Sequence, residues 1–300
     1  MRSTPPQSKA PWRVDDSTAT PLTDYHTKKN PMHHTPIPAI PDAPPSIRNL
    51  AHGRSIHDTS SSPEARVYAL GAEGASSNAL FAKTAAAGTL AHEARMSAAF
   101  HELGLGPEVV EYLPGDDMHA DWLVTRAVIG EDCTAARYLA EPEQLCDLLA
   151  VRLRTLHELF RRQPDRLAAL NVPDVRTRYL SNVERGWRAG RFDAQFCPRT
   201  TAADAHRIAA EAAGELRTDA LLHGDYCLPN VILDDWHFSG FIDFDHAGLS
   251  DRHIDVFWGA WTLWFNLHTS AYCSRFLDAY GRDVIDEGKL AAIAAMECFM

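Results

Sequence analysis

The chain has 300 residues, 45% of them hydrophobic and 23% charged, with a formal net charge of −11 at pH 7. These values are ordinary for a globular protein and exclude a collagen-like, low-complexity or wholly disordered chain. The acidic excess argues against a nucleic-acid partner, because such binding needs Lys and Arg to neutralise phosphates. No apolar run approaches the ~20 residues of a membrane-spanning helix, and no signal peptide is evident. We therefore expect a cytoplasmic protein that binds neither membrane nor nucleic acid and whose acidic surface suits a small cationic partner.

Residues 1–45 hold ten of the 18 prolines, mixed with Ser, Thr and His and without apolar periodicity. Such a segment cannot bury enough apolar surface to fold, and we expect a disordered extension. Met32 lies inside it, which raises the hypothesis that residues 1–31 are dispensable or precede the natural start.

Short apolar runs bounded by Gly and polar clusters then predict strands, and one stretch with a period near 3.6 predicts a helix that ends at Gly104. The strands are expected at 66–70, 80–83, 108–112 and 121–125, and the helix at 90–103. Residues 46–126 should therefore form a small antiparallel sheet lobe with one helix.

The character changes after residue 126. Leucines at helical spacing predict a helix over 142–160, and an Ala-rich stretch predicts another over 202–216. Between further helices, apolar runs at 231–234 and 238–243 flank a short polar turn and predict a hairpin. Residues 127–300 are therefore expected to form a larger, mainly helical lobe, and the fold class is α+β.

The densest polar motif is His223-Gly-Asp-Tyr-Cys-Leu-Pro-Asn230, followed thirteen residues later by Asp243 at the end of an apolar strand. Asp225 and Asn230 bracket a tight loop, so their side chains and that of Asp243 are expected to converge. Phosphoryl transfer needs one carboxylate that orients or deprotonates the attacking hydroxyl, and further oxygen ligands that hold Mg²⁺ against the nucleotide. The spacing therefore indicates phosphoryl transfer.

The pattern H-G-D-x-x-x-x-N followed by I-D resembles the signature of the aminoglycoside phosphotransferases, relatives of protein and choline kinases. Residues 221–256 resemble most closely the aminoglycoside 3'-phosphotransferases, the kanamycin and neomycin kinases, and the resemblance runs from Ser61 to the C-terminus. It implies a two-lobed, protein-kinase-like fold, with ATP and Mg²⁺ as cofactors. The implied reaction transfers the γ-phosphate to a hydroxyl of an aminoglycoside, favouring the 3'-hydroxyl, and confers antibiotic resistance. The sequence leaves the choice between monomer and homodimer open.

Carried over residue by residue, the resemblance implies that Asp225 is the catalytic base and that Asn230 and Asp243 bind Mg²⁺. His223, which opens the motif, and Asp255 would support the catalytic loop.

The resemblance also assigns a nucleotide site. Lys83 ends a short strand and Glu93 follows ten residues later on the next helix, as in kinase-like folds that use such a pair to present the Lys to the α- and β-phosphates. Ser62 lies in a Ser-Pro segment that resembles the phosphate-covering loop of the 3'-kinases. The main chain at Thr125 and Ala127 aligns with the hinge that would bind adenine.

The family ends in a carboxylate-rich Asp-Glu-aromatic tail that holds the amino sugars. Here Glu297 is kept, but Met296 stands where the family has the Asp before it, and the chain runs one residue longer. After the expected metal-binding Asp243 and one apolar residue, Asp245-His246 stands where the family usually has Gly-Arg. These changes remove a positive charge and add a negative one near the acceptor. The residues expected to bind the acceptor are Asp245, Asp251, Glu297 and Met300.

Two alternatives share much of this pattern. A kinase of choline, homoserine or another small amino-alcohol or sugar would keep every catalytic residue and differ only in its acceptor pocket. A catalytically inactive nucleotide-binding protein belongs to another class, and the joint presence of both the Lys-Glu pair and the loop motif argues against it. A protein kinase is not expected, because only eleven residues separate Asp243 from Asp255 and no Ala-Pro-Glu follows.

Overall fold

The computed structural model describes residues 35–61, 63–71 and 78–300. These residues fall into two compact units, each described by itself. The first comprises residues 35–138 and 228–247, and the second residues 139–227 and 248–300. Residues 127–300 were expected to form one lobe, whereas in the structure the stretches 127–138 and 228–247 pair with each other and belong to the first unit.

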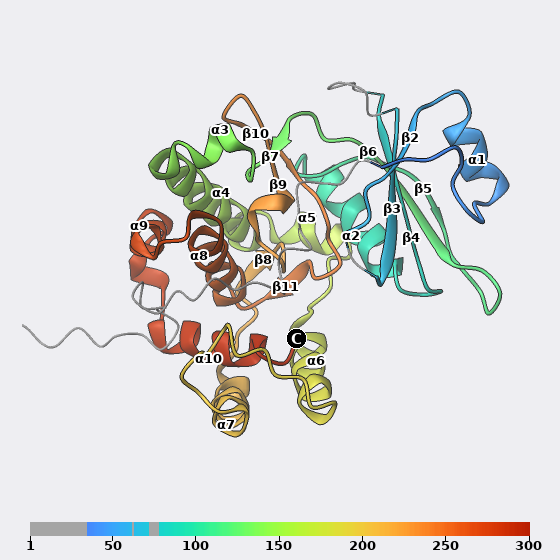
Figure 1. Ribbon diagram of the computed structural model, residues 1–300. Coiled ribbons are helices and arrows are strands. Elements are labelled where there is room, and N and C mark those ends of the chain that lie inside the picture. The colour runs from blue at the N-terminus through green and yellow to red at the C-terminus, as the bar shows by residue number, and fades with distance from the viewer. Residues whose placement is uncertain (1–34, 62, 72–77) are drawn as a thin grey trace, which may run out of the picture. The chain divides into compact units, whose positions relative to one another are not determined.

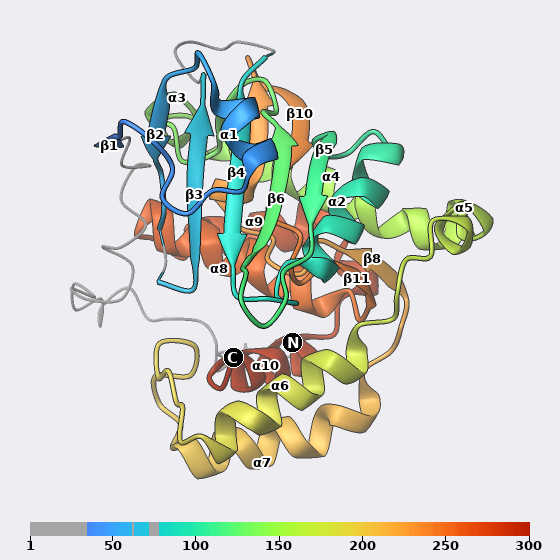
Figure 2. The same ribbon diagram turned by 90° about the vertical axis from the view of Figure 1, so that its right-hand side faces the viewer.

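The first unit is built on a six-stranded sheet whose order is β1-β2-β3-β4-β6-β5 (Figure 2). All its neighbouring strands are antiparallel. Its strands are β1 (Thr35–Pro36), β2 (Ile56–Asp58), β3 (Ala65–Leu70), β4 (Leu80–Ala85), β5 (Val109–Leu113) and β6 (Asp121–Arg126). The four predicted strands are therefore confirmed, and Lys83 pairs with Val67 on one side and Leu123 on the other.

Two helices, α1 (Pro45–Ala51) and α2 (Ala91–Glu102), pack against this sheet. One apolar cluster joins α1 to the sheet and contains Ile40, Ala43, Ile47, Ala51, Tyr68, Leu70, Leu80, Ala82, Trp122 and Val124. A second joins the start of α2 to Ala85 and Leu123. Because successive strand residues point to opposite faces, Lys83 shares the α2 face with Ala85.

Residues 35–45 correct one expectation. They were placed in the disordered extension, yet Ile40 and Ala43 are buried against the sheet. The proline-rich composition of this short segment indicated disorder, although its two apolar side chains, Ile40 and Ala43, pack into the core. The rest of the predicted extension, residues 1–34, lies outside the described residues.

Local chemistry explains where α2 begins and ends. The carboxylate of Asp121 accepts the main-chain N–H groups of Gly88 and Leu90, at 3.0 and 2.8 Å, and so caps the approach to the helix. At the other end Gly104 adopts φ 73°, and the N–H of Leu105 donates to the carbonyl of Phe100 at 2.8 Å. This is a glycine-dependent helix stop, as the sequence predicted.

The predicted hairpin is formed by β9 (Val231–Asp234) and β10 (His237–Phe241), and β7 (Glu131–Asp132) adds a third strand in the order β10-β9-β7. The turn residues Asp235 and Trp236 both have positive φ, which matches the right-handed twist of a tight hairpin. A short helix, α3 (Ala136–Leu139), follows β7.

The second unit is mainly helical (Figure 1). Its helices are α4 (Pro142–Arg162), α5 (Pro164–Ala169), α6 (Arg176–Arg188), α7 (Ala202–Ala212), α8 (His253–Leu267), α9 (Ala271–Tyr280) and α10 (Glu287–Glu297). A two-stranded sheet pairs β8 (Ala220–Leu222) with β11 (Gly248–Ser250). The apolar stripe of α4 faces α8, α9 and β8. Among the described residues, no helix combines the length and apolarity needed to cross a membrane.

Candidate functional site

The first unit brings Lys83, Glu93 and Asp243 together. Lys83 Nζ, from β4, lies 2.8 Å from Glu93 Oε2 in the first turn of α2 and 3.1 Å from Asp243 Oδ1 just after β10. The Glu93 side chain is 7% exposed, whereas that of Asp243 is 45% exposed. One carboxylate therefore anchors the ammonium from inside, and the other meets it at a solvent-accessible position.

The charges of this trio act on one another. Burial alone would lower the pKa of Lys83, but the Asp243 and Glu93 carboxylates outweigh it and raise that pKa, so the ammonium stays charged. Burial raises the pKa of Glu93, with Lys83 opposing and Asp243 adding to the rise. Lys83 thus carries a fixed positive charge, suited to binding phosphate.

The segment that carries Asp243 is held against α2 by packing. The Phe244 ring lies 4.4 Å from that of Phe100, and the carbonyl of Ala247 lies 2.8 Å from His92 Nε2. Asp243 itself has φ 65°, a left-handed conformation that costs a non-glycine residue ~1–3 kcal/mol. Such strain persists only where the surroundings enforce it, and it is common at functional sites.

Asn230 lies at the same end of the hairpin as Asp243. It ends a 3₁₀ turn, Leu228–Asn230, and its carbonyl accepts the N–H of Ile242 at 3.1 Å. The main chain therefore brings the two predicted metal ligands next to each other. An amide oxygen and a carboxylate suit Mg²⁺, which protein carboxylates and nucleotide phosphates commonly hold together. The donor set thus fits the expected ion.

The second unit holds the H-G-D loop that follows β8. Asp255, fully buried in the first turn of α8, accepts the main-chain N–H of His223 at 2.7 Å through Oδ2 and that of Gly224 at 2.8 Å through Oδ1. The N–H of Asp225 in turn lies 3.3 Å from His223 Nδ1. Gly224 has φ 86°, a conformation that favours glycine. Asp255 therefore fixes the main chain that carries the proposed base, and Asp225 itself is half-buried.

Sequence reasoning missed His157 of α4. This buried imidazole lies with Nε2 3.2 Å from Asp255 Oδ2 and so completes the set of groups around that carboxylate. One signal was available, because His157 follows Leu153 by one helical turn and thus shares the apolar face of α4. That signal indicates burial, but it does not reveal the partner, which lies 98 residues away.

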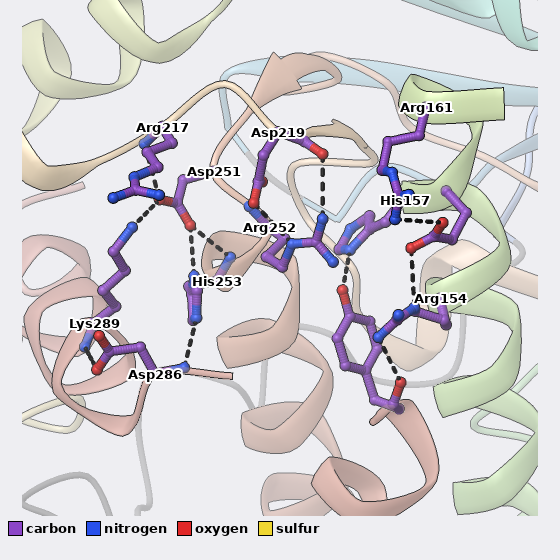
Figure 3. A network of polar contacts seen from close by, with 12 residues as sticks. Arg154, His157, Arg161, Arg217, Asp219, Asp251, Arg252, His253, Asp286 and Lys289 are labelled. Atoms are coloured by element: carbon purple, nitrogen blue, oxygen red, sulfur yellow. Dashed lines mark hydrogen bonds and ion pairs between the residues drawn. The ribbon is translucent and has the colours of Figure 1, made fainter. Parts of the chain in front are cut away.

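Asp251 does not have the role expected for it. Its side chain is only 1% exposed and accepts from His253 Nδ1 at 2.6 Å, Lys289 Nζ at 2.8 Å and the N–H of Arg217 at 2.9 Å (Figure 3). These groups hold its pKa well below the ordinary range, although burial opposes them. The structure contradicts a substrate contact for Asp251 and gives it the internal role of joining β11, α8 and α10.

Glu297, at the end of α10, is also buried. Its Oε1 accepts the hydroxyl of Tyr179 at 2.8 Å, and the Trp258 side chain donates a further hydrogen bond. Burial raises the pKa of Glu297 to about 8. The two other residues expected at the acceptor are more accessible, since Asp245 is 37% exposed in its side chain and Met300 is half-buried.

The raised pKa of Glu297 predicts a pH effect on stability. Between pH 4.5 and pH 8 the folded chain holds a proton that the unfolded chain releases, so the free energy of unfolding should fall as the pH rises through this window. Glu297→Gln cannot ionise and should be spared this loss. Urea unfolding at pH 5 and pH 8.5 is expected to show the variant gaining more than about 1 kcal/mol over wild type at the higher pH. Parallel pH profiles for the two proteins would contradict the assignment.

The remaining nucleotide-site residues are placed as follows. Thr125 lies in β6 opposite Phe81, and the N–H of Ala127 donates to the carbonyl of Ala79 at 2.9 Å. An adenine contact through Ala127 would therefore use its carbonyl. Ser62 lies outside the described residues, but Ser60, two residues before it, is fixed, because its hydroxyl accepts the N–H of Val67 at 2.9 Å.

Comparison with known proteins gives consistent matches. The profile of the family described as "Phosphotransferase enzyme family" matches residues 60–293. A "Probable aminoglycoside 3'-phosphotransferase" of Lactococcus lactis subsp. lactis (strain IL1403) is 41% identical over 259 residues, which cover 85% of this chain and 94% of the relative. An "Aminoglycoside 3'-phosphotransferase" of Streptomyces fradiae is 30% identical over 259 residues, covering 79% of this chain and 87% of the relative. The crystal structure of an aminoglycoside-3'-phosphotransferase of type VIII superposes with a TM-score of 0.64 at 27% identity, covering 85% of this chain and 97% of that one.

Proposed function

The chain belongs to the phosphotransferase enzyme family, and within it we propose that the protein transfers the γ-phosphate of ATP to a hydroxyl of an aminoglycoside antibiotic, so conferring resistance. The 3'-hydroxyl is the favoured acceptor, in keeping with the names of the relatives at 41% and 30% identity. The observation that carries the proposal is the charged Lys83 held between Glu93 and Asp243, with the main chain of Asn230 bonded to that of Ile242 just before Asp243. This is a phosphate and metal site in a chain whose second unit presents an anchored H-G-D loop.

On the nucleotide side, Lys83 binds the phosphates. Its contact with the half-exposed Asp243 is the one that incoming phosphate oxygens can replace, whereas buried Glu93 keeps the ammonium in place. Asn230 and Asp243 would hold Mg²⁺. When bound, the ion neutralises charge on the phosphates during transfer.

On the acceptor side, Asp225 orients the attacking hydroxyl and accepts its proton. The freed oxygen forms a bond to the γ-phosphorus while the bond from that phosphorus to the bridging oxygen of ADP breaks, and the bonding electrons leave with ADP. Most of the rate then comes from placement of the reacting groups. Asp255 supplies that placement through the two N–H groups preceding Asp225.

The acceptor is cationic, and we assign its ammonium groups to carboxylates. Asp245 is accessible for this purpose, and half-buried Met300 is the other accessible residue of the expected acceptor set. Tyr179 and Trp258 donate hydrogen bonds to Glu297, so an acceptor ammonium would have to displace them to contact this side chain. A charge-assisted hydrogen bond contributes ~1.5–3 kcal/mol, so a few suffice for selective binding.

Lys83→Met should lower kcat/KM for ATP by roughly 10- to 100-fold, because it removes charge-assisted contacts to phosphate worth ~1.5–3 kcal/mol. It also leaves Glu93 buried without its cation, so thermal unfolding must be measured beside the initial rates. Arg66→Met is the matched control, since it removes an exposed cation of the neighbouring strand, whose guanidinium lies 3.5 Å from Asp58 Oδ2. A Lys83→Met enzyme with wild-type kcat/KM for ATP would remove Lys83 from the phosphate site.

The proposed function is tested by resistance. Expression in a susceptible host should raise the inhibitory concentration of an aminoglycoside that carries a 3'-hydroxyl, but not of its 3'-deoxy analogue, and Asp225→Ala should abolish the effect. Resistance to both compounds would move the attacked hydroxyl elsewhere. An absence of resistance to every aminoglycoside, with the protein present and folded, would refute the proposal.

A further inference from the structure

His157 is held from both sides. Its Nε2 faces Asp255 Oδ2 at 3.2 Å, and its Nδ1 lies 2.7 Å from the hydroxyl of Tyr280, the last residue of α9. The imidazole is fully buried and Tyr280 is 2% exposed, so water does not replace either partner. The imidazole therefore connects α9 to the carboxylate that anchors the H-G-D loop.

The direction of these hydrogen bonds follows from the groups present. Burial lowers the pKa of His157, so the imidazole is neutral and carries one N–H. The Asp255 carboxylate accepts, which places that hydrogen on Nε2. Nδ1 must then accept, and Tyr280 donates its hydroxyl hydrogen.

The Tyr280 hydroxyl also interacts electrostatically with a cation, the Arg252 guanidinium. Arg252 is fixed by Asp219, with Nε 2.9 Å from Oδ2 and the main-chain N–H 3.0 Å from Oδ1 (Figure 3). The donors therefore run in one direction, from Tyr280 through His157 to Asp255.

We propose that Tyr280 is a positioning residue for phosphoryl transfer, whose hydroxyl selects the His157 tautomer that donates to Asp255 and so fixes the main chain that carries Asp225. The inference rests on the proposed function, because Tyr280 affects phosphoryl transfer only if Asp225 is the catalytic base. Two other buried tyrosines differ from it, since Tyr138 and Tyr226 donate to the main-chain carbonyls of Leu233 and Leu149. Only an imidazole has two tautomers to choose between.

Loss of the hydroxyl leaves Nδ1 buried without a donor. A flipped ring, or a proton moved to Nδ1, would then take the Nε2 donor away from Asp255 and loosen the His223 and Gly224 amides. A misplacement of about 1 Å at a reacting group can cost ~10²-fold in rate. A partial loosening at Tyr280→Phe is therefore expected to lower kcat by roughly 10-fold, with the KM values for ATP and acceptor within about twofold of wild type.

The matched control is Tyr138→Phe. It also removes a buried tyrosine hydroxyl, one that donates to Leu233 at 3.0 Å in the first unit. Both variants should lose similar thermal stability, but Tyr138→Phe should keep its kcat. Equal losses of kcat in the two variants, or wild-type kcat in Tyr280→Phe, would overturn the proposal.

A double-mutant cycle with His157→Gln isolates the tautomer. A glutamine amide keeps a nitrogen donor for Asp255 without any choice of tautomer, so adding Tyr280→Phe to it should change kcat by less than about threefold. The same 10-fold loss in both backgrounds would show that Tyr280 acts by packing alone, and the proposal would fail.

Hydrogen exchange gives a readout that does not depend on turnover. The peptide over residues 221–227 should exchange faster in Tyr280→Phe than in wild type or Tyr138→Phe, and equal exchange in all three would overturn the inference. A wild-type protein that phosphorylates no aminoglycoside would instead refute the proposed function. The two failures are therefore distinguishable.

Discussion

Asp225→Asn is expected to lower kcat by ~10²- to 10⁴-fold, the usual contribution of a positioned general base. The amide has nearly the shape of the carboxylate but cannot accept the hydroxyl proton. The loop is anchored through the amides of His223 and Gly224 on Asp255, not through the Asp225 side chain alone, so Tm should change little. Steady-state rates with ATP and an aminoglycoside, together with thermal unfolding, measure both effects.

Asp234→Asn is the control for this substitution. It removes the charge of an exposed carboxylate at the end of β9 and should leave both kcat and Tm near wild type. A folded Asp225→Asn enzyme with near-normal kcat would remove Asp225 from the base role. Loss of activity in both variants would point instead to a general dependence on negative charge.

Asp255→Asn is expected to reduce both stability and turnover. Its two oxygens accept three donors within a fully buried site, and the substitution turns one acceptor into a donor facing an N–H group. A buried donor left unpaired costs ~1–3 kcal/mol, and the uncompensated surroundings add to that cost. We expect the free energy of unfolding to fall by ~2–5 kcal/mol and kcat of the remaining folded enzyme to fall by roughly 100-fold.

Asp121→Asn separates the two effects of Asp255→Asn. Asp121 is equally buried and accepts the N–H groups of Gly88, Leu90 and Gly115, but it belongs to the first unit, whereas the H-G-D loop belongs to the second. It should lose comparable stability in urea unfolding and retain much more of its kcat at low temperature. If the two variants lost kcat equally, Asp255 would be a stabilising residue with no special effect on the loop.

The buried and the accessible carboxylates of this protein differ in what they contact. Asp255 is buried inside the second unit and accepts main-chain N–H groups, while Asp225, the proposed base, is half-buried. In the first unit Glu93 has the buried role and Asp243 the accessible one, with Lys83 between them. In each unit the buried carboxylate fixes a position, and we propose that the accessible one acts on the substrates.

Much of this could be predicted from sequence, because the relevant signals are local. Short apolar runs bounded by Gly and polar clusters located β3, β4, β5 and β6, and Gly104 marked the end of α2. The H-G-D motif and the Asp that follows the hairpin have fixed spacing, which sets their main-chain positions relative to one another. Lys83 in β4 and Glu93 in the first turn of α2 are ten residues apart in the sequence, and the two side chains form an ion pair in the structure.

Other features were beyond sequence reasoning because they depend on distant partners. His157 and Tyr280 meet across 123 residues, and nothing near either one indicates the other. The donors around Asp251 include Arg217 and Lys289, which are distant in the sequence, so from sequence alone its negative charge suggested a substrate contact. Residues 35–45 show the reverse case, since two apolar side chains order a segment whose overall composition indicates disorder.

The most direct test of the account is ³¹P and ¹H NMR of a mixture of purified protein, ATP, Mg²⁺ and kanamycin. The account predicts a new phosphomonoester on the 3'-oxygen, formed in step with ADP, and no such product with Asp225→Asn. Unchanged ATP, or release of inorganic phosphate with the antibiotic unmodified, would contradict it.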